Sequence, residues 1–177
     1  NEMSNVPKKF DIKDTKRILL GWPSKIAYDG NLDEVVSFYS KASGQTQERT
    51  SFFKGKKLTS IFIYAMCLGK HAGLFNDYEK KDGKIDRRAT IDVEYFASQP
   101  EYVWMMIATA FDHAKNVEDM NNDELLKLFD NPSKIVEICE KYANFGIHQL
   151  IKMNDDASIG DPYKGYDEKI SDLLDES

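Results

Sequence analysis

The chain has 177 residues, of which 41% are hydrophobic and 12% aromatic, and this is enough apolar material for one domain with its own core. The composition excludes an intrinsically disordered protein. The longest apolar run, around residues 103–111, is about half of the ~20 residues that span a bilayer, so we expect no membrane partner. The polar N-terminal stretch has no signal-peptide pattern, and we therefore expect a cytoplasmic protein.

The net charge of −6 is unevenly distributed. Residues 154–177 carry eight acids and two lysines, a net of −6, whereas residues 54–88 carry nine Lys or Arg and four acids, a net of +5. A neutral body with a basic segment and an acidic end differs from a uniformly acidic protein. We predict a helical domain over residues 1–153 and an acidic tail over residues 154–177 that includes a short helix.

The first third of the chain predicts two short helices. One runs over residues 10–22, and the other starts at Asn31 and stops at Gly44. Residues 25–29 between them fit no clear pattern and remain undecided. A polar, basic loop is expected over residues 45–57.

A stronger helix is predicted over residues 58–72. Thr59 is its expected N-cap, and Gly73 is the residue expected to end it. Its apolar stripe is expected to face the core and consists of Ile61, Phe62, Tyr64, Ala65, Leu68 and Ala72.

The next elements are a charged loop over residues 74–88 and a segment over residues 91–97 that is either a short helix or extended. A third strong helix is predicted from Ser98, its N-cap, to about Lys115. Because it is apolar on most sides, we expect it to be buried on most sides. A short helix is predicted over residues 122–129.

The stretch from Asn131 to Lys152 predicts the longest helix, and we expect the rest of the chain to pack around it. Asn131 is suited to cap this helix, and Pro132 fits its first position. Gly146 lies on the apolar face, where it costs about 1 kcal/mol relative to Ala, and is expected to let another backbone come close. A linker is expected over residues 155–166. Strand signals are sparse, so the sequence predicts an all-α fold of six to eight helices in a single domain, with at most a minor strand pair.

No motif in the sequence specifies a reaction. It contains no Gly-rich phosphate loop, no nucleophile elbow and no Cys/His spacing typical of zinc. The segment around Asp82 and Gly83 resembles the middle of a calcium loop, but the flanking positions lack the oxygen ligands that calcium needs. We therefore predict no catalytic residue, no metal and no cofactor.

The histidines and cysteines support the same prediction. His71, His113 and His148 are expected to be exposed or to cap helices, with a general-base role for His148 as the alternative. Cys67 and Cys139 are expected to be buried thiols.

The candidate nucleic-acid-binding residues flank the helix predicted over residues 58–72 and can form one patch only if the loop that follows this helix folds back. Such a patch would track phosphates, and the alternative is a pair of solvated loops. Neighbouring aromatic residues (Phe52, Phe53, Phe75 and Tyr78) could stack on bases or belong to the edge of the core. The basic set is Lys54, Lys56, Lys57, Lys80, Lys81, Lys84, Arg87 and Arg88.

Two segments together resemble the Dnd system-associated protein 4 family. Residues 53–69, FKGKKLTSIFIYAMCLG, are similar to its motif F-x-T-x-K-D followed by A-A-x-L-G, and residues 140–147, EKYANFGI, are similar to E-E-Y-A-N-x-G-L. Between them, residues 91–96 resemble its short I-x-x-x-x-F segment. Lys57 is followed by Leu58 where the family has Asp, and the resemblance covers roughly residues 52–151. The matching positions Tyr142, Ala143, Asn144 and Gly146 also fit a packing signature, which we favour over chemistry.

The resemblance implies a role near DNA modification or restriction, because the family is similar to accessory genes found beside DNA phosphorothioation and phage-defence operons. The leading hypothesis is a non-enzymatic accessory protein that contacts DNA or other defence-system proteins. The second is a protein–protein adaptor or self-associating scaffold. The third is an enzyme such as a nuclease, built from scattered acids that show no diagnostic spacing.

The acidic tail carries a prediction of its own. Its charge is opposite to that of residues 54–88, so it is expected to fold back and compete with an anionic partner. Deleting the tail from residue 156 onward should then tighten DNA binding at low salt.

Overall fold

The computed structural model describes residues 12–30, 56–74, 80–81, 84–85 and 88–157. This part of the chain is mostly helical with a small antiparallel sheet, as predicted, and its five α-helices are slightly fewer than the predicted six to eight. The helices predicted after Asn31 and within the tail lie outside the described residues. The helices are α1 (Ile12–Leu19), α3 (Leu58–Ala72), α4 (Pro100–Asn116), α5 (Asn122–Leu128) and α6 (Pro132–Ala157). The other elements are β1 (Lys25–Asp29), β2 (Lys80–Lys81), β3 (Lys84–Ile85), β4 (Arg88–Asp92) and the 3-10 helix η2 (Val93–Phe96).

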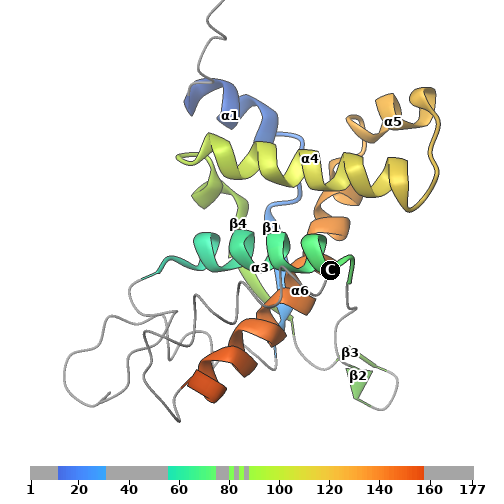
Figure 1. Cartoon of the computed structure of the whole chain (residues 1–177). Coiled ribbons are helices and arrows are strands. Elements are labelled where there is room, and N and C mark those ends of the chain that lie inside the picture. Colours follow the sequence, from blue (N-terminus) through green and yellow to red (C-terminus); the bar gives the residue numbers. More distant parts are fainter. Residues whose placement is uncertain (1–11, 31–55, 75–79, 82–83, 86–87, 158–177) are drawn as a thin grey trace, which may run out of the picture.

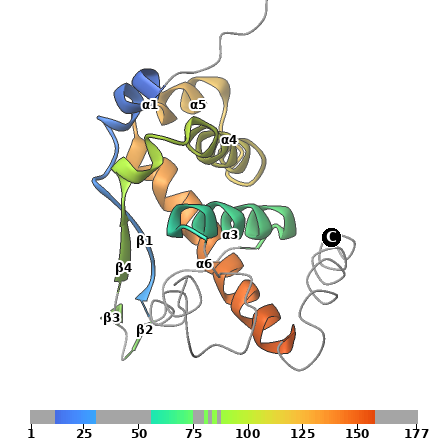
Figure 2. The same ribbon diagram turned by 90° about the vertical axis from the view of Figure 1, so that its left-hand side faces the viewer.

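The sheet resolves the two segments that the sequence left undecided. β1 pairs antiparallel with β4, and Ile26 lies opposite Ile91. The last four residues of β1 are all buried, so the strand lacks the alternation of a half-exposed strand. The segment 91–97 adopts both structures in turn, since its start completes β4 and η2 follows. The sheet stands along one side of the molecule in Figure 2, and β2 and β3 form a separate short ribbon.

Helix α6 makes the most extensive contacts of the described elements, which agrees with its predicted central place, and α3 crosses it near its middle (Figure 1). A Cβ atom on Gly146 of α6 would lie well inside 3.0 Å of the Ala65 carbonyl of α3. A Cβ on Gly69 of α3 would likewise lie less than 3.0 Å from the Tyr142 carbonyl of α6. The close approach predicted for Gly146 is confirmed, and each helix contributes one glycine to it.

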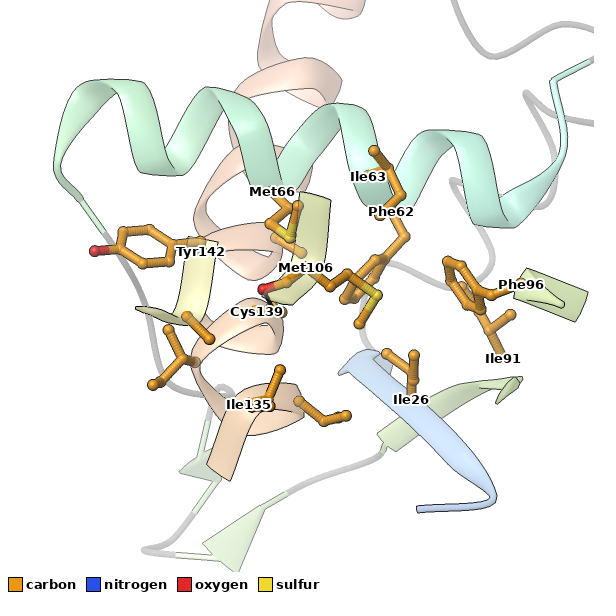
Figure 3. Close-up of a cluster of buried hydrophobic side chains, with 14 of the residues drawn as sticks. Ile26, Phe62, Ile63, Met66, Ile91, Phe96, Met106, Ile135, Cys139 and Tyr142 are labelled. Carbon is orange, nitrogen blue, oxygen red and sulfur yellow. Dashed lines mark hydrogen bonds between the residues drawn. The ribbon is translucent and has the colours of Figure 1, made fainter. Parts of the chain in front are cut away.

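The core lies between the sheet and helices α3, α4 and α6, whose side chains converge in Figure 3. The rings of Phe62 and Phe96 meet edge to face, with centroids 6.1 Å apart. Cys139 is fully buried, and its thiol donates to the carbonyl of Met106 at 3.3 Å. Both cysteines are free thiols, but Cys67 is only half-buried.

Two of the predicted helix caps are confirmed. Asn131 Oδ1 accepts a hydrogen bond from the backbone N–H of Lys134 at 3.3 Å, and Pro132 begins α6. Gly73 ends α3 with a φ of 65°, a left-handed conformation that glycine adopts without strain.

Two other predicted caps are wrong. Thr59 is buried within the first turn of α3, and Lys57 takes the cap position. Ser98 precedes the true cap of α4, which is Gln99. Residues 155–157, predicted as the start of a linker, are helical instead, because α6 continues to Ala157. No helix in the described residues has the length and apolarity to cross a membrane.

Candidate functional site

Glu140 and Asn144, two residues of the second motif, bind the backbone of β1. Glu140 Oε1 accepts from the backbone N–H of Ala27, and Asn144 Oδ1 accepts from that of Asp29, each at 2.8 Å. The spacing explains the fit, because four residues of a helix advance about 6 Å and two residues of a strand about 6.6 Å. One helical turn later, His148 Nε2 lies 3.4 Å from the buried carboxylate of Asp29. Glu140 and Asn144 thus accept from backbone N–H groups of β1 as a neighbouring strand would, whereas His148 contacts the side chain of Asp29.

His148, the residue that the sequence offered as an alternative general base, is paired with Asp29. A buried acid that orients a partly exposed imidazole is part of many acid–base sites. Such a site also needs a substrate cavity beside the imidazole. Neither residue lines any of four hollows of the described part of the chain, and their contact joins α6 to β1.

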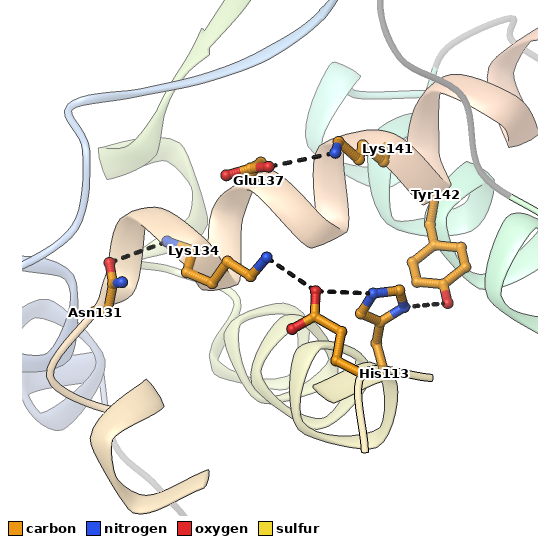
Figure 4. Close-up of polar contacts among 7 residues, drawn as sticks. His113, Asn131, Lys134, Glu137, Lys141 and Tyr142 are labelled. Carbon is orange, nitrogen blue, oxygen red and sulfur yellow. Dashed lines mark hydrogen bonds and ion pairs between the residues drawn. The ribbon is translucent and has the colours of Figure 1, made fainter. Parts of the chain in front are cut away.

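A second polar cluster joins α4 to α6 (Figure 4). His113 Nδ1 lies 2.7 Å from the Tyr142 hydroxyl, and His113 Nε2 lies 3.5 Å from Glu118 Oε1. Lys134 Nζ binds the same Glu118 oxygen at 2.9 Å. His113 is buried, so the expectation that it is exposed or caps a helix is wrong. Its partner Tyr142 is 29 residues away, and local sequence gives no sign of the contact.

This cluster holds its groups in their neutral or paired forms. Burial lowers the pKa of His113 and raises the pKa of Tyr142, so both stay uncharged near neutral pH. Because Nε2 faces a carboxylate, it carries the imidazole hydrogen, and Nδ1 accepts from the Tyr142 hydroxyl. The hydrogen bond from Lys134 lowers the pKa of Glu118. The cluster fastens α4 to α6, and its four residues line a hollow of about 220 Å³.

The four family-motif positions therefore all have packing contacts. Tyr142 bonds to His113, Ala143 is fully buried, Asn144 binds β1 and Gly146 lies against α3. Within the described ranges, no three His, Cys, Asp or Glu side chains gather in a way that could hold a metal ion.

The described members of the basic set lie in two places. Lys56 and Lys57 are exposed and directly precede α3. Lys80, Lys81 and Lys84 belong to the β2–β3 ribbon and Arg88 opens β4, whereas Lys54 and Arg87 lie outside the described residues. Figures 1 and 2 both show the β2–β3 ribbon apart from the start of α3. These members do not come together in the single patch that the sequence left open.

Two hollows flank Lys57. The hollow on one side, called here the α3–α4 groove, has a volume of about 740 Å³ and is lined by Lys56, Lys57, Ser60, Ile63, Tyr64, Cys67, Gln99, Tyr102 and Met105. The hollow on the other side has about 600 Å³ and is lined by residues of α3, β4 and η2, among them the acids Asp92 and Glu94. Among the described residues, the groove lining contains both exposed lysines of this end of α3 and no acid.

Two tyrosines give the groove its aromatic character. Tyr64 projects from α3 and is 36% exposed, so its expected place in the core-facing stripe is wrong. Tyr102 projects from α4, and its hydroxyl donates to Ser60 Oγ at 3.1 Å, which joins the two helices.

Comparison with known proteins gives no relative. No family model, no curated protein and no solved structure matches this chain.

The sequence pointed to Lys56 and Lys57 but missed Tyr64, Tyr102 and Gln99. Both tyrosines occur in helices rich in apolar residues, where an aromatic ring is usually part of the core. Their exposure depends on how α3 and α4 lie against each other, which no local pattern specifies. The only available signal was that Tyr64 lies within two turns of the lysines.

Proposed function

We propose that the protein is a cytoplasmic, non-enzymatic accessory protein of a DNA-modification or phage-defence system, and that it contacts DNA through Lys56 and Lys57. The resemblance of residues 53–69 and 140–147 to the family motifs supports a role in such a system. The observation that supports the DNA contact is the placement of two exposed lysines at the positive end of a helix. Packing contacts at all four motif positions support a non-enzymatic role.

The charge arrangement at the start of α3 favours an anion. Helices normally carry acids in their first turn, because the backbone dipoles place about half a positive charge there. The first turn of α3 has no acid, and Lys57 provides no side-chain cap. The N–H groups of Leu58, Thr59 and Ser60 lie within that first turn, where a helix has no internal acceptors. A DNA phosphate would supply both the missing charge and the missing acceptors.

A salt-dependent DNA titration tests the proposal. Duplex and single-stranded DNA would be titrated by fluorescence anisotropy at several salt concentrations from about 50 to 200 mM. Replacing Lys56 and Lys57 by Gln should reduce the slope of log affinity against log salt by about 2, because each phosphate contact contributes about 0.9. The matched control replaces two exposed lysines of α4 and α5, Lys115 and Lys127, and should leave the slope unchanged. Folded protein that binds neither form of DNA at any salt would contradict the DNA contact.

One observation favours the adaptor as the second candidate. Leu20 is 86% exposed and Tyr95 is 61% exposed, and both line a hollow of about 500 Å³ beside α1 and η2. Large apolar side chains gathered on a surface often mark a protein interface. Light scattering of the wild type and of Leu20→Lys tests this hypothesis. The adaptor predicts association that the substitution removes, and a wild type that is strictly monomeric and brings no partner through purification contradicts it.

A further inference from the structure

We propose that the α3–α4 groove binds an unpaired nucleotide of single-stranded DNA. The base would lie against Tyr64 and Tyr102, and its phosphate would lie beside Lys56 and Lys57 at the start of α3. This inference rests on the proposed DNA contact, and it specifies that the start of α3 binds single-stranded DNA.

The phosphate position follows from charge. Lys57 separates the two hollows, but the hollow beside β4 contains Asp92 and Glu94, whereas the described lining of the groove contains no acid. An anion at the start of α3 is therefore favoured on the groove side.

The base position follows from the groove walls. A volume of about 740 Å³ lies within the range of roughly 300–1,000 Å³ that small-molecule sites occupy. Each wall contributes one aromatic ring, Tyr64 from α3 and Tyr102 from α4. The hydrogen bond from Tyr102 to Ser60 holds one ring in place before a ligand arrives. Met105, 38% exposed, adds a polarizable side chain that adapts to a flat ring.

One polar group in the groove is suited to the edge of a base. Gln99 lines the groove, and its Oε1 has no hydrogen-bond partner in the described part of the chain. This oxygen is buried, so an exocyclic amine or ring N–H of a base could donate to it once the Gln99 side chain turns toward the groove. In a duplex these donors are already paired and both faces of the base are stacked, so a duplex offers the groove only its phosphates. The groove should therefore prefer a single strand.

The experiment compares a labelled single-stranded oligonucleotide with the duplex of the same sequence. Tyr64→Leu keeps an apolar side chain but removes a stacking ring, so it should weaken single-strand binding about ten-fold and leave duplex binding unchanged. Phe129→Leu removes a half-exposed ring of similar size outside the groove and is the matched control. Met105→Glu should weaken single-strand binding through its charge, whereas Met105→Gln should not, and this pair keeps the test valid if Tyr64→Leu is unstable.

The outcomes separate this inference from the proposed function. Equal affinity for single strand and duplex, with no effect of Tyr64→Leu or Met105→Glu, would overturn the groove inference and leave the lysine contact standing. A free nucleoside monophosphate that competes as well as the strand would overturn the assignment to a strand. Absence of binding to both DNA forms would overturn the proposed DNA contact together with this inference.

Discussion

Gly146→Ala should destabilise the protein, although alanine is the better helix former. The new methyl group would lie inside 3.0 Å of the Ala65 carbonyl, which belongs to the backbone of α3 and cannot rotate away. Ala65, Met66 and Ala143 are fully buried around this crossing. Separating the two helices would therefore loosen the best-packed part of the core.

The net cost is set by two opposing terms. Replacing a helix-interior glycine by alanine gains about 1 kcal/mol of helix propensity. Overpacking a close helix contact costs typically 1–3 kcal/mol and more when the backbone itself must move. Because the obstructing carbonyl of Ala65 is backbone, we expect the upper end of that range and a net loss of about 2 kcal/mol. For a chain of this size the melting temperature should fall by roughly 4–8 °C.

Urea and thermal unfolding would measure the loss. Gly21→Ala is the control, since the nearest atom to its new Cβ would be Pro132 Cγ at 3.8 Å, an ordinary contact. Its effect should stay within about 0.5 kcal/mol. Gly69→Ala should behave like Gly146→Ala, and the double variant should lose less than the sum, because the first substitution already separates the helices. A Gly146→Ala protein as stable as the wild type would refute the close crossing.

Two further predictions concern the polar contacts. Burial lowers the folded-state pKa of His113 below its ordinary value of 6.5, so the unfolded chain binds the proton more tightly and stability is lost as pH falls below about 6.5. Melting temperatures recorded downward from neutral pH should fall less in His113→Gln than in the wild type, whereas His71→Gln, at an exposed site, should keep the wild-type pH dependence. Glu140→Ala should lose about 1–3 kcal/mol of unfolding free energy because it leaves the N–H of Ala27 without its acceptor. Glu140→Gln retains an oxygen there and should lose less, and equal losses would show that the hydrogen bond is not the cause.

The sequence predicted best where one face of a helix carries the core. The helix over residues 58–72 was predicted with its observed bounds, and the role of Gly146 was recognised because a glycine on an apolar helix face typically marks a close contact with another backbone. β1 could not be recognised, because a strand buried on both faces shows no alternation. The caps at Thr59 and Ser98 were misplaced because a hydroxyl residue marks a helix start only when the backbone begins to turn there.

The site was less predictable than the fold, since it depends on contacts between distant parts of the chain. Composition identified the basic segment, but only the tertiary structure shows that the β2–β3 ribbon lies apart from the lysines that precede α3. Tyr64 has the same helical spacing as its core-facing neighbours, and only the position of α4 decides that it lines a groove.

The contacts of Glu140 and Asn144 with β1 also decide how far the sheet can grow. An exposed edge strand offers its N–H groups to any extended segment that approaches, which is the usual route to intermolecular sheets and fibrils. The N–H groups of Ala27 and Asp29 are already bound to side chains of α6, and α6 covers that edge. A strand from another copy therefore cannot add beside β1 unless α6 first detaches, so any association of copies on this side has to use side-chain surfaces.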